Sequence, residues 1–123
     1  MKKIKAIKID TVSKSIYEIE ITPELQSYYK EMNCDLIEVG CRVYPTAYNT
    51  DEIIQQSILA DVLYVDEEGS WKENKSFIFC TGYGQHIRTF LGTAIVIGTD
   101  EEGNSISHKQ DIEKFKKFIT FFE

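Results

Sequence analysis

Most of the chain follows the two-residue hydrophobic period of a β-strand. Residues 4–9 read Ile-Lys-Ala-Ile-Lys-Ile, and residues 15–21 alternate again after a polar turn at 11–14. This pattern predicts two short strands in an antiparallel hairpin, the first with one solvated face. Residues 35–44 and 61–65 predict two more strands, and Gly40 indicates a bulge or a close backbone approach in the first of them. Residues 93–99 contain the uninterrupted run Ala-Ile-Val-Ile, which predicts a strand through the centre of the sheet. Residues 77–80 form an apolar run short enough for a strand or for one helical turn.

Other segments change to the helical period. Thr22, Pro23 and Glu24 are typical of a helix start, with Thr22 as N-cap, and the spacing predicts that this helix stops near Asn33. A short helix is expected at 50–58. A C-terminal helix is expected after Ser107 as N-cap, with one apolar face packed on the sheet: Ile112, Phe115, Phe118, Ile119 and Phe122.

The mixture of the two periods predicts one domain, residues 1–123, of the α/β (α+β) class. We expect a two-layer arrangement with a mainly antiparallel sheet of about five or six strands and two or three helices packed on it.

A short phrase occurs twice, because residues 63–69 and 96–103 are apolar runs that each end in Asp-Glu-Glu-Gly. An apolar run bounded by Asp and Gly is typical of a buried strand that ends in a turn. Contiguous acids do not supply the alternate-residue ligand spacing of an EF-hand calcium loop. We therefore predict solvated turn tips here and no metal site.

Charge and cysteine content exclude several function classes. The net charge of −6 disfavours direct nucleic-acid binding and docking on an anionic membrane. The three cysteines form no CxxC pair, there is no apolar leader segment, and no run approaches the ~18 apolar residues of a spanning helix. These features predict a cytoplasmic protein, and no cofactor is expected.

The strongest candidate for chemistry is residues 81–88, Thr-Gly-Tyr-Gly-Gln-His-Ile-Arg. A glycine-rich turn can direct N–H groups at a phosphate, and a nearby arginine adds bidentate recognition. The segment matches neither a P-loop nor a dinucleotide fingerprint, and a plain loop between two sheet segments is the alternative. No nucleophile–base pair can be assembled, so we expect a non-enzymatic protein with no catalytic residues. The predicted ligand-binding residues are Arg42, Tyr83, Gln85, His86 and Arg88.

Three segments together resemble a known but uncharacterised family of small domains. They are Ile37-Glu38-Val39, residues 61–69 and residues 90–103, and they give the pattern I-E-V … D-E-x-G … G-x-A-I-V-x-G-x-D-x-x-G. The family is encoded largely by phages, plasmids and mobile elements of gut bacteria. Residues 42–58 depart from its pattern. The resemblance implies a protein that works by binding, either sequestering a host immune signal or blocking a host enzyme.

Two binding functions follow. In the first, the protein sequesters a small anionic nucleotide-like signal as a counter-defence. In the second, its acidic surface mimics a polyanion and inhibits a host nucleic-acid enzyme. The grouping of the scarce arginines with aromatic residues favours the small anion.

An unpaired sheet edge and surplus tyrosines also predict a homo-oligomer, a dimer with Tyr44 or Tyr48 at the interface and Arg42 close to it.

Overall fold

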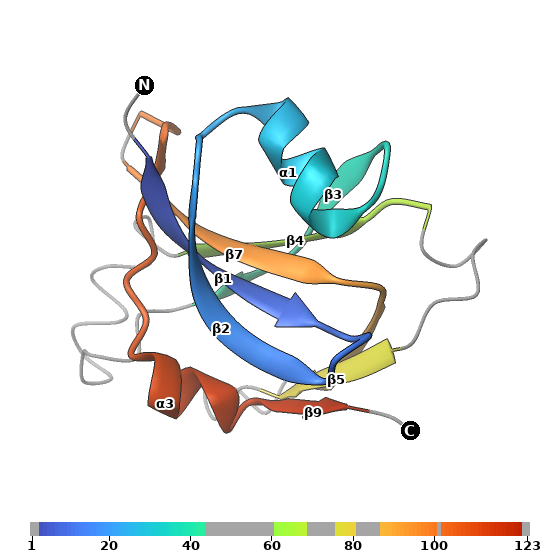
Figure 1. Cartoon of the computed structure of the whole chain (residues 1–123). Coiled ribbons are helices and arrows are strands. Elements are labelled where there is room, and N and C mark those ends of the chain that lie inside the picture. Colours follow the sequence, from blue (N-terminus) through green and yellow to red (C-terminus); the bar gives the residue numbers. More distant parts are fainter. Residues whose placement is uncertain (1–2, 44–60, 69–75, 81–86, 101, 122–123) are drawn as a thin grey trace.

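The computed structural model describes residues 3–43, 61–68, 76–80, 87–100 and 102–121. Within these ranges the chain forms nine strands and two helices (Figure 1). In chain order they are β1 (Ile4–Asp10), β2 (Ser15–Ile21), α1 (Leu25–Met32), β3 (Ile37–Val43), β4 (Asp61–Asp66), β5 (Ser76–Cys80), β6 (Ile87–Leu91), β7 (Ala94–Thr99), β8 (Ser105–Ile106), α3 (Ile112–Lys116) and β9 (Ile119–Phe121).

The main sheet has six antiparallel strands, in the order β2-β1-β7-β4-β3, with β8 paired to β7. The two alternating runs at the start of the chain form the predicted hairpin, from Ile4 opposite Ile21 to Asp10 opposite Ser15. β7 lies in the middle of the sheet, and Val96 is opposite Ile7 of β1 and Leu63 of β4. The prediction of a central strand at 93–99 is therefore confirmed.

Both faces of the main sheet are covered (Figure 1). On one face α1 packs Tyr28 and Met32 against a cluster that includes Ile95 and Ile97 of β7. On the other face lies a three-stranded sheet of order β6-β5-β9, together with α3. The core between these layers contains Ile7, Leu63, Val96, Phe77, Phe79 and Phe115.

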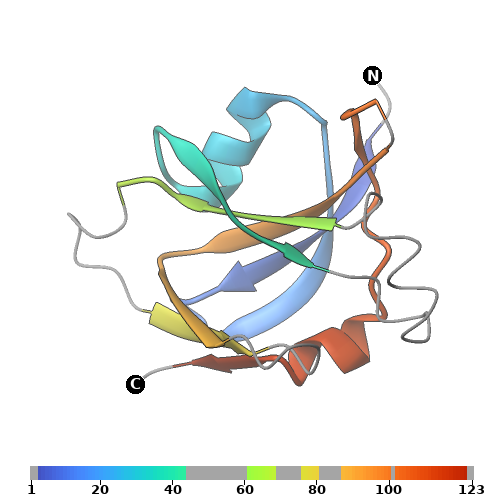
Figure 2. The same cartoon turned by 180° about the vertical axis from the view of Figure 1, so that it is seen from behind.

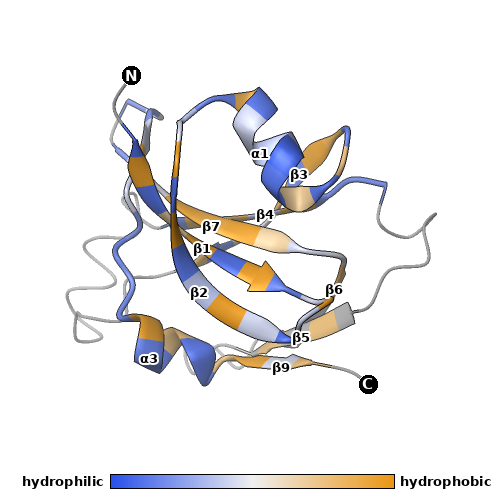
Figure 3. Ribbon diagram, in the orientation of Figure 1, coloured by the Kyte–Doolittle hydropathy of each residue, from blue (hydrophilic) through white to orange (hydrophobic). Residues whose placement is uncertain are grey.

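This double cover corrects the expectation of one solvated face on β1. The neighbours Ala6 and Ile7 point to opposite faces of the sheet, and both are 0% exposed. Figure 3 shows the same arrangement, with β7 apolar along much of its length between the two layers. The α+β class is confirmed, with a mainly antiparallel sheet of six strands and two helices packed on it; the second sheet was not predicted.

The predicted C-terminal helix is wrong in both its start and its length. Asp111 is the N-cap of α3, and its carboxylate accepts hydrogen bonds from the N–H groups of Glu113 and Lys114 at 3.1 and 3.4 Å. Residues 119–121 leave the helix and form β9, with Ile119 opposite Phe79. These β-branched and aromatic residues pair with the edge of β5, and that pairing outweighs the helical spacing.

The first helix also begins later than predicted. Its N-cap is Glu24, whose side chain makes no capping hydrogen bond. Before the helix, the Glu24 N–H donates to the carbonyl of Thr22 at 2.7 Å in a tight turn, so Thr22 belongs to that turn. Its predicted end is confirmed by Asn33, which adopts a left-handed conformation with φ of 52°.

The predicted irregularity at Gly40 is confirmed, because the register of β3 against β4 shifts between Val39 and Cys41. A Cβ at Gly40 would lie 2.9 Å from the Phe90 ring. The backbone therefore approaches the core at this position more closely than a side chain would allow.

The first aspartate of each Asp-Glu-Glu-Gly sequence caps a turn among the described residues. Asp66 accepts a hydrogen bond from the Glu68 N–H at 2.9 Å. Asp100 accepts from the N–H groups of Asn104 and Glu102 at 2.8 and 2.9 Å, and these bonds hold the pKa of its carboxyl below the ordinary value. Gly103 has φ of +85°, the left-handed conformation expected of glycine in such a turn.

Candidate functional site

The structure places two of the predicted ligand-binding residues, and it places them in different sheets. Arg42 is an exposed residue of β3, opposite Val62 of β4. Arg88, the last residue of the predicted glycine-rich segment 81–88, belongs to strand β6 and lies opposite Phe79. The two strands pack on each other, because a Cβ at Gly40 of β3 would lie 2.9 Å from the Phe90 ring of β6. A binding site that joins the two arginines therefore stays a prediction. The other predicted site and interface residues, Tyr83, Gln85, His86, Tyr44 and Tyr48, lie outside the described residues, as does the helix expected at 50–58.

The histidine in the described part of the chain has a structural position. The Nδ1 atom of His108 accepts a hydrogen bond from the Gln110 N–H at 3.1 Å. This bond assigns the ring proton to Nε2, which donates to Glu18 at 2.8 Å. The His108 side chain is 5% exposed. The imidazole therefore fastens the segment after β8 to strand β2.

A second polar cluster fastens the same segment to strand β4. Asp61 is 0% exposed, and its Oδ2 accepts from the Lys109 N–H and from the Gln110 side-chain amide, both at 2.8 Å. The Lys109 ammonium lies 2.9 Å from Oδ1, although neither atom makes a well-aligned hydrogen bond. Buried charges require such compensation, so this cluster explains the buried carboxylate as a structural feature.

Among the described residues, no three His, Cys, Asp or Glu side chains gather in a way that could hold a metal ion. None of the described helices is both long and apolar enough to cross a membrane.

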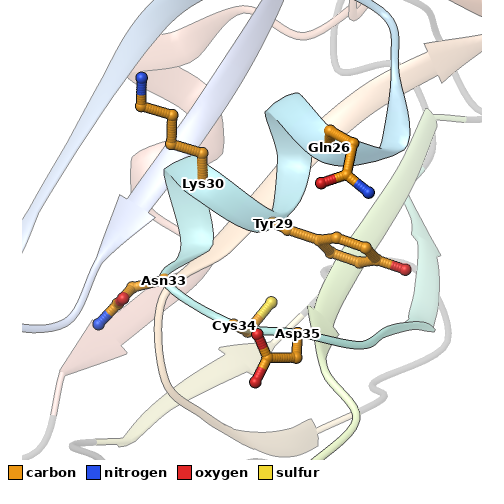
Figure 4. Close-up of a pocket in the computed structure, with 6 residues that line it drawn as sticks. All are labelled: Gln26, Tyr29, Lys30, Asn33, Cys34 and Asp35. Atoms are coloured by element: carbon orange, nitrogen blue, oxygen red, sulfur yellow. The ribbon is translucent and has the colours of Figure 1, made fainter.

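One pocket lies beside α1 and the residues that follow it (Figure 4). Its volume is about 410 Å³, and it is an open depression with mixed chemistry. The Lys30 ammonium and the Asp35 carboxylate give the lining both signs of charge. We call it the Tyr29 pocket; its lining is Gln26, Tyr29, Lys30, Asn33, Cys34 and Asp35.

A second pocket, of about 350 Å³, lies where the start of β1 meets β8 and the turn before α1. It has a basic residue and two hydroxyls beside apolar walls, and its lining contains no acid among the residues that the structure describes. We call it the Lys3–Ser105 pocket; its lining is Lys3, Ile4, Pro23, Ser105, Ile106 and Ser107.

The hydrogen bonds around the Lys3–Ser105 pocket determine what its hydroxyls can offer. Ser107 Oγ accepts from the Lys5 N–H at 2.9 Å, and a hydroxyl that accepts in this way still has its own proton to donate. Behind Ser105 lies the phenol of Tyr28, whose hydroxyl is buried and makes no well-formed hydrogen bond among the described residues. Burial raises the pKa of Tyr28, and the nearby Ser105 side chain opposes that rise, so the phenol stays neutral and can also donate.

The pocket is assembled by the fold and not by a local motif. Strand β8 pairs with the end of β7, with Ile106 opposite Gly98. The segment then crosses β7 so closely that a Cβ at Gly98 would clash with the Ser107 carbonyl. The lining comes from residues 3–4, 23 and 105–107, and sequence analysis missed it because no pattern joins segments so far apart. The helical spacing after residue 107 predicted a helix cap at Ser107 in place of a pocket residue.

The chain matches no curated protein and no solved structure. The family model described as "Domain of unknown function (DUF3846)" matches residues 4–120. That match covers nearly the whole chain, and it confirms the prediction of an uncharacterised domain family. The protein is a member of the DUF3846 family of domains of unknown function.

Proposed function

We propose that this domain is a non-enzymatic binding protein that sequesters a small anionic, nucleotide-like molecule, and that the Lys3–Ser105 pocket receives the charged group. The main observation that supports this proposal is the set of hydrogen-bond donors at the pocket. The Lys3 ammonium and the hydroxyls of Ser105 and Ser107 offer protons, and none of the described lining residues carries a carboxylate that would compete with an anionic ligand. Charge-assisted hydrogen bonds of this kind are the strong contacts of anion sites.

The walls and size of the pocket support the rest of the ligand. Ile4, Pro23 and Ile106 provide an apolar surface against which a base or another flat apolar group can pack. The volume of about 350 Å³ lies at the small end of the range of about 300–1,000 Å³ for small-molecule sites. A mononucleotide-sized ligand fits this description better than a long polyanion does.

The contacts of His108 and Asp61 support a binding role over a catalytic one, because both side chains are used to hold the fold. His108 uses both ring nitrogens to hold Gln110 and Glu18, and Asp61 is occupied by Lys109 and Gln110. Because family resemblance suggests a mobile-element context, we further propose that the ligand is an immune signal in the cytoplasm of a host cell, and that the activity is counter-defence.

The test is thermal unfolding of the purified protein with a panel of cyclic and linear nucleotides and with inorganic phosphate. A ligand at about 100 times its Kd stabilises a protein by about 2.7 kcal/mol. For a domain of this size that is a rise in Tm of roughly 10 °C. We expect at least one nucleotide to produce such a rise, and phosphate alone to produce a smaller one.

Matched variants locate the site. Lys3→Gln and Ser105→Ala should abolish most of the ligand-induced rise, whereas Lys30→Gln, which removes the lysine of the Tyr29 pocket, should leave it unchanged. If Arg88→Ala alone abolished the ligand-induced rise in Tm, the binding site would be assigned to residues 81–88, the segment predicted from sequence. Failure of every nucleotide to raise the Tm would refute the proposal.

A further inference from the structure

Strand β2 is a long and regular edge of the main sheet. All seven of its residues pair with β1 without a register shift. No described strand pairs with its other side, and no backbone hydrogen bond from the described turns and loops reaches that side (Figure 1 and Figure 2). The opposite edge, β3, differs because its register is broken at Val39/Cys41. Edge strands that are long and unbroken are templates for pairing with another chain.

The two faces of β2 have different chemistry. Glu18 and Glu20 lie opposite Ile7 and Lys5 of β1, and therefore share the face that packs toward α3. Both glutamates are exposed. Tyr17 and Ile19 lie on the other face; Tyr17 is 39% exposed and Ile19 is half-buried. An incoming strand would therefore meet acids on one face and an aromatic and an aliphatic group on the other.

The inner neighbour of β2 shows which strand chemistry these faces accept. In β1, Lys5 lies opposite Glu20, and Ala6 lies opposite Ile19. A basic residue thus faces an acid at one of these positions and apolar residues meet at the other, whereas Ile7 lies opposite Glu18 and Lys8 opposite Tyr17. Opposite charges directly across a strand pair are favourable, and like charges are unfavourable.

The same rule disfavours a second copy of β2 as the occupant. Two antiparallel β2 strands would bring the glutamates of both copies onto one shared face, where they repel each other. The acids therefore protect the edge against self-association while leaving it complementary to a basic strand.

We infer that the outer edge of β2 binds an extended segment of a partner protein in which Lys or Arg alternates with apolar residues. The segment adds one strand to the sheet, its basic side chains meet Glu18 and Glu20, and its apolar side chains cover Tyr17 and Ile19. Main-chain hydrogen bonds supply affinity in this mode of recognition, and the alternating side chains supply specificity. This surface is separate from the Lys3–Ser105 pocket.

The test uses a capped, fluorescein-labelled peptide in which lysine and valine alternate over seven residues, with a control peptide that has glutamate in place of lysine. Fluorescence anisotropy measures the Kd of the full-length protein for each. We expect the basic peptide to bind and the acidic one not to bind. Glu20→Lys should weaken binding about five- to tenfold, because it replaces an attraction by a repulsion across the new strand pair.

Glu24→Lys is the matched control. It makes the same charge change on an exposed residue just beyond β2, where the side chain makes no capping hydrogen bond. It should weaken binding by less than about twofold, since only long-range attraction changes. Circular dichroism confirms that both variants are folded. Equal weakening in both variants would show that the peptide responds to net charge and would overturn the inference.

Amide hydrogen exchange followed by NMR locates the added strand. Peptide binding should slow the exchange of alternate amides within residues 15–21, those that point away from β1. Protection confined to β3, β6 or β9 would overturn the assignment to β2. Lys3→Gln should leave peptide binding unchanged, so failure here and failure of the ligand pocket are distinguishable.

Discussion

The buried ion pair between Asp61 and Lys109 allows a quantitative test of how the segment after β8 is held. Lys109→Met removes the positive charge beside the Asp61 carboxylate, which is 0% exposed. The carboxylate keeps its hydrogen bonds from the backbone N–H of residue 109 and from the Gln110 side-chain amide. Removing one partner of a buried pair costs about 3–5 kcal/mol. That is a large part of the roughly 5–15 kcal/mol of a typical domain, and it corresponds to a fall in Tm of roughly 12–20 °C.

The reverse substitution should cost less. Asp61→Asn leaves the ammonium without its counter-charge, but the Lys109 side chain is 22% exposed and can turn toward water. The asparagine oxygen can still accept from the Lys109 N–H and from Gln110. We expect a loss of about 1–3 kcal/mol, which is typical of an imperfectly satisfied buried polar group.

The double variant completes the cycle. Asp61→Asn with Lys109→Met removes both charges together, so its stability should lie within about 1–2 kcal/mol of the wild type and above that of Lys109→Met alone. Urea unfolding followed by circular dichroism gives the four free energies, provided that the m-values agree. Additive losses in the double variant, or losses below about 1 kcal/mol in both single variants, would refute the account of this cluster.

Four further predictions concern a close backbone approach, a turn, the core and pH. Gly98→Ala should destabilise the domain by about 1–3 kcal/mol in urea unfolding, because the new methyl group clashes with the Ser107 carbonyl. Gly103→Ala should cost about 1–2 kcal/mol through its φ of +85° alone, and Gly103→Asn should recover part of that loss, since asparagine tolerates this conformation. Phe115→Ala should lower the free energy of unfolding by about 3–5 kcal/mol, because Phe115 is 0% exposed and its ring centroid lies 6.0 Å from that of Phe79. A loss below about 1 kcal/mol would contradict its place in the core. Burial alone raises the pKa of Asp10, but hydrogen bonds from residues 12 and 13 outweigh it and leave the pKa lowered. Asp10 therefore stabilises the fold above its unfolded pKa of about 3.9 and loses that contribution as the pH falls through the lower folded value. Stability curves of wild type and Asp10→Asn should converge in this acid range.

The sequence predicted those elements whose cause is local. The hairpin of β1 and β2 follows from alternation, the end of α1 follows from Asn33, and the bulge in β3 follows from Gly40. The central position of β7 follows from four apolar residues without a polar interruption, since such a run must be covered on both faces.

The parts that could not be predicted depend on pairing between distant segments. Ile119 continues the apolar spacing of Phe115, so the local pattern favours a longer helix, and the open edge of β5 decides for a strand. The predicted turn at 100–103 lets β8 fold back on β7, but the Lys3–Ser105 pocket also requires that residues 105–107 meet the start of β1. No pattern in the sequence records that long-range contact. The predicted ligand site stays a prediction, because Tyr83, Gln85 and His86 lie outside the described residues. Arg42 and Arg88 belong to different sheets, and no local pattern records how those sheets pack.

The central position of β7 has a consequence for biosynthesis. β7 joins the β1–β2 pair to the β4–β3 pair, and it lies late in the chain, at residues 94–99. While the ribosome is still translating the preceding residues, both strand pairs can exist, but the sheet edges that β7 will fill are open. Long-range strand pairing is slow, and such open edges invite association between nascent chains. The main sheet can therefore close only after β7 has left the ribosome, and a polypeptide truncated before β7 leaves the two strand pairs unjoined.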